Sequence, residues 1–239
     1  MMLLLALVAA QAPISPSGPS SPSAQAGPSS PSAQAGPALL DKLAADADGR
    51  AETLKALSFT ATTTTLDLDD AGRAQHSAVK VERVVRGKST TVSCTVDKVA
   101  VVDRADMQAC SLPGMSLQID SAPGGEPFGT HERGSWQMHV DDATHIHLAQ
   151  VGTQDPAMAG TATLDGKGAL AALDLAPARL PALVDVMSLR MRYRDVAIAG
   201  GAMGRMLDTL SFELHGGALF VKKAVRTTTH YSEYAAAAE

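Results

Sequence analysis

The segment 187–194 alternates between apolar and polar residues, and this alternation constrains the fold more than any other feature of the chain. The first parity is apolar and consists of Met187, Leu189, Met191 and Tyr193. The second parity consists of one serine and three arginines, Ser188, Arg190, Arg192 and Arg194. Successive side chains of a strand point to opposite faces, so a period of two places these groups on opposite sides. The segment is therefore predicted to be a half-exposed antiparallel strand.

The flanking sequence continues this pattern. Leu210, Phe212 and Leu214 share one parity of a second strand, and the glycines of segment 215–218 predict a hairpin into a return strand that ends near Tyr234. Upstream, short strand patterns are separated by turn signals at roughly ten-residue spacing, which is typical of an antiparallel meander. We therefore expect an α+β fold that is mainly antiparallel β.

The N-terminal part divides into three segments. Residues 1–12 form an apolar run that ends in Ala10-Gln11-Ala12, a pattern typical of a secretory signal peptide. Residues 13–37 are a low-complexity linker of Pro, Ser, Gly and Ala, in which nine residues are repeated without change as 27–35. From residue 38, apolar residues recur at helical spacing and predict an amphipathic helix: Leu39, Leu40, Leu43, Ala47, Ala51, Leu54 and Leu57.

These boundaries predict one folded domain, residues 38–234, followed by a frayed tail at 235–239. A signal peptide predicts that the domain works in the periplasm or outside the cell. The formal net charge of -5 argues against a nucleic-acid partner, which would require a basic surface.

Cys94 and Cys110 are the two cysteines of the chain. In an exported protein such a pair is more often a disulfide than two free thiols, so we expect a disulfide. Two buried thiols are the alternative.

Motifs for catalysis or cofactor binding are missing from the sequence. No Gly-x-Ser-x-Gly elbow, P-loop or dinucleotide-binding glycine pattern occurs. His145 and His147 share one face of a strand, and His139 is a possible cross-strand neighbour, which would be the start of a metal site. A closed site needs further ligands, so a solvated strand face is the favoured interpretation. We expect no catalytic residue, no metal and no cofactor.

The order of elements resembles that of a known family. A signal and an amphipathic helix are followed by the threonine-rich strand that begins Phe59-Thr-Ala-Thr, then by a long antiparallel meander. The segment 212–234, with Gly216-Gly217 and Lys222-Lys223, resembles the closing hairpin of periplasmic lipoprotein-carrier proteins of the LolA-like superfamily. This resemblance implies an incomplete, half-open β-barrel wrapped around the N-terminal helix, with a concave apolar face that holds acyl chains.

The predicted function follows from that concave face. We expect a binding protein, not an enzyme, that holds a lipid, an acyl chain or an acylated protein. The predicted ligand-binding residues are apolar and lie on predicted strands: Trp136, Met138, Met187, Leu189, Met191, Phe212 and Leu214. The alternatives are an interaction module that binds an envelope protein without lipid and a metal-dependent hydrolase that uses the histidines.

Overall fold

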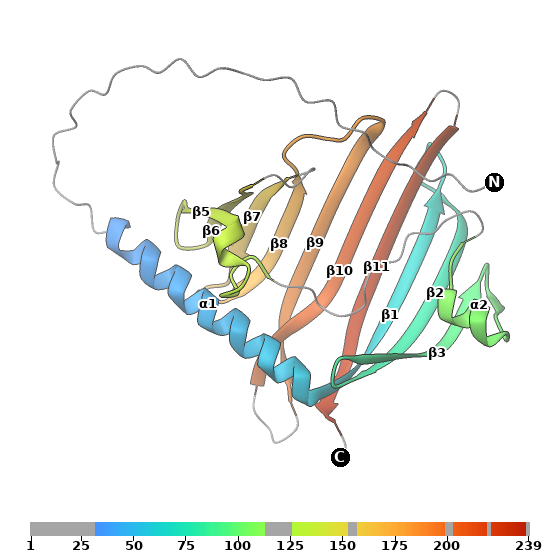
Figure 1. Cartoon of the computed structure of the whole chain (residues 1–239), viewed down its shortest axis with the longest axis horizontal. Helices are drawn as coiled ribbons and strands as arrows, with labels where there is room; N and C mark the ends of the chain where they lie inside the picture. The colour runs from blue at the N-terminus through green and yellow to red at the C-terminus, as the bar shows by residue number, and fades with distance from the viewer. Residues whose placement is uncertain (1–31, 113–125, 153–156, 199–202, 219–220, 238–239) are drawn as a thin grey trace.

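The structure is a computed structural model that describes residues 32–112, 126–152, 157–198, 203–218 and 221–237 (Figure 1). It contains one long helix, one short helix and one 3-10 turn: α1 (Ser32–Ala56), α2 (Arg104–Ala109) and η1 (Arg133–Ser135). The remaining elements are strands: β1 (Leu57–Leu68), β2 (Ala74–Val85), β3 (Lys88–Val96), β4 (Val99–Ala100), β5 (Trp136–Val140), β6 (His145–Gln150), β7 (Met158–Leu164), β8 (Leu170–Pro177), β9 (Val184–Ala197), β10 (Met203–Ala218) and β11 (Val221–Ala236).

The strands form one antiparallel sheet. Their order is β4-β3-β2-β1-β11-β10-β9-β8-β7-β6-β5, so β1 and β11 are neighbours inside the sheet and β4 and β5 are its edges. Among the described residues the two edges do not pair, and the sheet is open. The expected mainly antiparallel α+β architecture is confirmed. The predicted signal peptide, and the linker as far as residue 31, lie outside the described residues.

Helix α1 crosses the strands on one side of the sheet (Figure 1). We call this side of the sheet the helix face. Leu43 and Ala47 are buried in the core, which is what the amphipathic pattern predicts. The pattern is wrong at the next turn, because Arg50 is buried there and Ala51 is exposed. A guanidinium takes this core position because it has an ion-pair partner, described below.

The boundaries of α1 and β11 also differ from the prediction. The helix begins at Ser32, inside the expected linker, because the segment 33–35 (Ala-Gln-Ala) favours a helix. At the other end, Ala235 and Ala236 belong to β11 and pair with Ser58 and Leu57 of β1. Backbone pairing therefore orders part of the expected tail.

An aromatic cluster fills the core where β1 meets β11. The Phe59 ring lies 5.9 Å from that of Tyr231 and 5.3 Å from that of Tyr234, measured between ring centroids. Residues 231 and 234 have opposite parity, yet both side chains are buried. Glu233, with φ of 55°, and a register shift in the β1–β11 pairing explain this, because a bulge reverses the parity of a strand.

The glycines of segment 215–218 do not form the predicted hairpin turn. Strand β10 continues through Gly216 and Gly217, which pair with Lys223 and Lys222 of β11. A Cβ atom at Gly216 would lie 2.3 Å from the carbonyl oxygen of Leu183. The glycine is therefore required here for the close approach of a neighbouring backbone, and a turn is not needed to explain it.

Candidate functional site

The seven predicted ligand-binding residues all lie on the helix face of the sheet. The register brings Leu214 opposite Met187 and Phe212 opposite Leu189, while Met191 lies opposite the buried Leu210. Opposed residues of an antiparallel pair project from the same face, so these side chains share one surface. Trp136 and Met138 come from β5, at the far edge of the sheet.

Residues that were not predicted to bind a ligand connect the predicted residues of β9 and β10 to those of β5. One residue from each strand between β10 and β5 contributes to a row across the helix face, and each residue is paired with the next one in the row. We call this row the middle row: Phe212, Leu189, Leu175, Gly160, Leu148 and Met138. The middle row runs without a charged residue from β10 to the edge strand β5. The row is therefore uncharged across the sheet.

Two parallel rows flank the middle row, and they differ in burial. The helix-side row, two residues nearer α1 on each strand, consists of Leu210, Met191, Leu173, Ala162, Ile146 and Val140. Leu173, Ala162 and Ile146 have no exposed surface. The rim row, two residues farther from α1, contains Leu214, Met187, Met158 and Trp136, and all four are half-buried. Burial therefore falls with distance from the helix.

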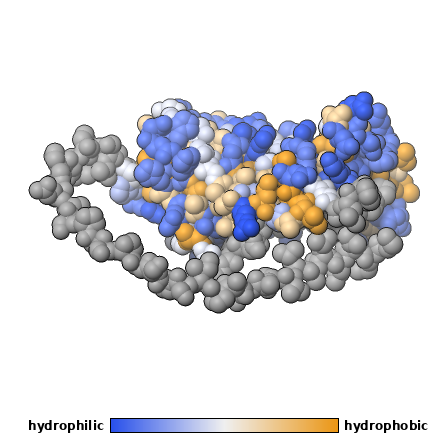
Figure 2. Space-filling model, turned by 90° about the horizontal axis from the view of Figure 1, so that it is seen from above, coloured by the Kyte–Doolittle hydropathy of each residue, from blue (hydrophilic) through white to orange (hydrophobic). Residues whose placement is uncertain are grey.

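The seven predicted residues are themselves all half-buried, whereas their neighbours Leu173, Leu175 and Leu148 are buried. Figure 2 looks onto the end of the sheet at which β10 ends, and it shows hydrophobic residues gathered near the middle between hydrophilic surfaces. The part of the helix face beyond α1 is therefore an apolar surface that the described residues cover only in part.

Glycine at position 160 leaves the middle row without a side chain on β7. A Cβ atom there would lie 1.9 Å from the carbonyl oxygen of Asp174 on β8. No other residue fits at this position without a shift of the backbone. The middle row therefore has no side chain between Leu175 and Leu148.

Beneath the rows, α1 contributes a buried ion pair. The Nε atom of Arg50 donates a hydrogen bond of 2.9 Å to Glu126, and a second guanidinium nitrogen bonds the other carboxylate oxygen. Burial acts to lower the pKa of Arg50, but the hydrogen bonds and charge of Glu126 outweigh it and hold that pKa above its ordinary value. Burial also raises the pKa of Tyr193 well above its ordinary value.

A cavity of about 30 Å³ lies beside this ion pair, lined by Arg50, Glu126, Tyr193, Met191 and Leu210 among others. A cavity of this volume is too small for a lipid. Among the described residues, the half-buried side chains of the middle and rim rows offer a larger apolar surface.

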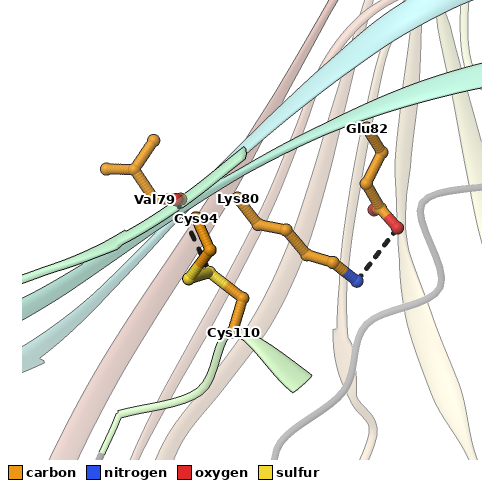
Figure 3. The surroundings of a disulfide bond; sticks show 5 residues. All are labelled: Val79, Lys80, Glu82, Cys94 and Cys110. Carbon is orange, nitrogen blue, oxygen red and sulfur yellow. Dashed lines mark hydrogen bonds and ion pairs between the residues drawn. A yellow bond between two sulfur atoms is a disulfide. The ribbon is translucent and has the colours of Figure 1, made fainter. Parts of the chain in front are cut away.

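Cys94 and Cys110 are joined in a disulfide, as the sequence predicted, with an S–S distance of 2.12 Å and Cα atoms 5.7 Å apart (Figure 3). Cys94 lies on the helix face of β3, opposite Lys80 of β2. Cys110 is the C-cap residue of α2, and its sulfur lies 3.5 Å from the carbonyl oxygen of Val79. The bond therefore attaches α2 to the half of the sheet that lacks the apolar rows.

The three histidines considered for a metal lie on the face opposite to α1. His139 and His147 are opposed on β5 and β6, and their Nε2 atoms lie 3.7 and 3.8 Å from Asp141. Hydrogen bonds from the side chain and backbone of Thr144 hold the pKa of Asp142 well below its ordinary value. Within the ranges given above, no three His, Cys, Asp or Glu side chains are grouped so as to hold a metal ion.

The arginines of β9 also project from the opposite face, as the alternation predicted. Arg192 pairs with Asp174 at 2.9 Å, and Arg194 pairs with Asp208 at 2.5 Å. All four side chains are more than a third exposed, so these pairs contribute little to stability.

Comparisons with known proteins found no match to a family model, to a curated protein or to a solved structure. Among the helices that the structure describes, none has the length and apolar content needed to cross a membrane.

Proposed function

We propose that this chain is an exported binding protein that holds a lipid, an acyl chain or an acylated protein on the helix face of its sheet. The observation that carries this proposal is the apolar middle row, which together with the half-buried rim row links the predicted residues of β10 and β9 to those of β5. Contiguous apolar surface on a monomer is a mark of a ligand or partner site.

Burial energetics support an apolar occupant. Covering apolar surface stabilises a complex by roughly 25 cal/mol per Å². Met187 and Leu214 of the rim row, and Phe212 of the middle row, retain such surface in the described structure. A charged or strongly polar ligand would gain nothing from contact with them, whereas an acyl chain would.

The proposed architecture is the half-open barrel of the LolA-like proteins, wrapped around α1. The sheet, whose edges β4 and β5 have no further partner among the described strands, and the long N-terminal helix are compatible with it. The disulfide supports the proposed periplasmic or extracellular location, because such bonds persist in oxidising compartments.

Native mass spectrometry of the folded protein, paired with organic extraction of the same sample, tests the proposal. We expect acyl species to co-purify, or a fluorescent fatty acid to be taken up by the stripped protein. Met187→Asp should abolish uptake because it places a carboxylate in the rim row. Ser188→Asp is the matched control, since the adjacent residue faces the opposite side of β9. No co-purifying lipid and no uptake would refute the proposal.

A second candidate function is protein binding without lipid at the edge strand β5. Among the strands that the structure describes, this one pairs only with β6, so one side of its backbone is open to a partner strand. Recovery of a specific envelope protein by the lipid-free chain, with no uptake of the fatty acid, would favour this function over lipid binding.

A further inference from the structure

The helix face changes from apolar to hydroxylated where β10 meets β11. Phe212 of the middle row lies opposite Thr227 of β11, which in turn lies opposite Thr65 of β1. The helix-side row continues in the same way, from Leu210 to Thr229 and then to Thr63. The apolar rows therefore end at a patch of four threonines that belongs to the same surface, and we call it the threonine patch.

The hydroxyls of the threonine patch are paired with one another. The Oγ1 atoms of Thr63 and Thr229 are 2.9 Å apart, and those of Thr65 and Thr227 are 3.3 Å apart. Two hydroxyls carry two hydrogens and one bond uses only one of them, so each pair keeps a hydrogen to donate. Among the described residues, neither pair has another side-chain acceptor.

These spare donors are not on a fully solvated surface. Thr229 and Thr227 are 1% and 4% exposed, whereas Thr63 and Thr65 are half-buried. Buried hydroxyls are normally satisfied by a hydrogen-bond partner. Each hydroxyl already has one partner, and each pair is reached through its half-buried member on β1, so a ligand that lies on the helix face can accept the hydrogen that the pair does not use.

The charges next to the threonine patch are balanced. Lys80 lies opposite Thr63 and pairs with Glu82 at 2.9 Å (Figure 3). Lys223 of β11 pairs with Asp67 at 3.0 Å. Because each ammonium has its own carboxylate, the patch offers hydrogen-bond donors and no net positive charge. It favours a head group that is uncharged or zwitterionic over one with a net negative charge.

We propose that the threonine patch binds the polar head of a lipid whose acyl chain lies along the middle and rim rows toward β5. This inference rests on the proposed function and specifies the ligand as an amphiphile with ester or phosphate oxygens in an uncharged or zwitterionic head. Five strand spacings separate β10 from β5, or about 24 Å along the sheet, which suits a long acyl chain.

Two double variants provide a matched test. Thr65→Val with Thr227→Val removes one hydroxyl pair from the helix face while keeping the shape of both side chains. Thr64→Val with Thr228→Val removes the adjacent opposed pair, which projects from the opposite face of the same two strands. The probes are lysophosphatidylcholine below its aggregation threshold and diphenylhexatriene, a hydrocarbon dye without a polar head.

We expect the first double variant to bind lysophosphatidylcholine about tenfold more weakly, which is the effect of one lost hydrogen bond. Its affinity for diphenylhexatriene should be unchanged, and the second double variant should match the wild type with both probes. Thr65→Ser with Thr227→Ser keeps both hydroxyls and should restore lysophosphatidylcholine binding, which separates the loss of donors from a change in folding.

Trp136, the one tryptophan of the chain, reports the direction of the bound lipid. Bromine near the end of the acyl chain should quench its fluorescence more strongly than bromine near the head. Equal binding of lysophosphatidylcholine by both double variants, or the reverse order of quenching, would overturn this inference while lipid binding itself stands. Failure of the wild type to bind either probe would overturn the proposed function together with it.

Discussion

The guanidinium of Arg50 lies 5.6 Å from the ring centroid of Tyr193, so α1 places a cation over an aromatic side chain of β9. The same guanidinium holds Glu126, and both charged side chains are at most 15% exposed. A cation, a carboxylate and a phenol thus share one desolvated site between the helix and the sheet.

Removing one member of this buried pair is expected to be costly. Glu126→Gln should lower the free energy of unfolding by about 3 kcal/mol, because it leaves a buried cation without its counter-charge. Arg50→Met combined with Glu126→Gln should cost less than the sum of the two single changes. Urea unfolding measures all three variants. Asp174→Asn is the control, since it breaks the exposed pair with Arg192 and should cost at most about 1 kcal/mol. Equal losses for Glu126→Gln and Asp174→Asn would contradict this prediction.

The burial gradient across the three rows predicts different outcomes for two methionines of β9. Met191→Asp places a carboxylate between the buried Leu210 and Leu173, and it should lower the free energy of unfolding by about 3 kcal/mol or more. Met187→Asp, in the rim row, should cost about 1 kcal/mol or less. Thermal and urea unfolding of the two variants, compared with wild type, provide the measurement. Similar losses would show that the rim row is as buried as the helix-side row.

The disulfide is expected to stabilise the folded state, and its cysteines are expected to be inaccessible to alkylating reagents in the folded protein. Cys94 and Cys110 are separated by 16 positions, and closing a loop of that length stabilises the folded state by about 3 kcal/mol. Replacing both cysteines by alanine should lower the free energy of unfolding by that amount. Both residues are at most 9% exposed, so alkylation under reducing conditions should require urea. Rapid alkylation of the reduced native protein would contradict the buried position of this bond.

Alkaline pH should weaken the fold through Tyr193 and Tyr234. Burial is the main cause that raises the pKa of each phenol above the ordinary value of about 10. A group with a raised pKa in the folded state contributes its full stability below the ordinary pKa and loses it as pH rises further. The free energy of unfolding should therefore fall above about pH 10, and Tyr193→Phe should make that decline shallower. Urea titrations between about pH 8 and pH 11 measure both effects, and an unchanged slope in the variant would exclude Tyr193 as a cause.

Strand alternation was sufficient to predict the face of the β9 residues from 187 to 194, because parity decides the side on which a side chain lies. It was not sufficient to predict the middle row. Leu175, Gly160 and Leu148 join Phe212 to Met138 only through the register of neighbouring strands, and register is a tertiary property.

Other features could not be predicted from the sequence, for related physical reasons. Glu126 lies 76 positions from Arg50, so periodicity alone marked Ala51 as the core residue and not the arginine. Tyr234 was assigned no core role because the bulge at Glu233 breaks the parity on which such an assignment depends. The threonines of β1 were recognised as part of a strand, whereas their pairing with the threonines of β11 was not.

The pairing of β1 with β11 has a consequence for the order of folding. Thr63 and Thr229, which are opposed in the middle of the sheet, are 166 positions apart in the chain. Local hairpins such as β2–β3 and β7–β8 are able to form as soon as their own residues are available, but β1 must wait for the last strand of the sheet. Contacts of such long range slow folding, because loop closure has to precede the gain from pairing. Until that closure, β1 has an unpaired edge beside its threonines, and this edge is where a chaperone or a second unfolded chain would attach.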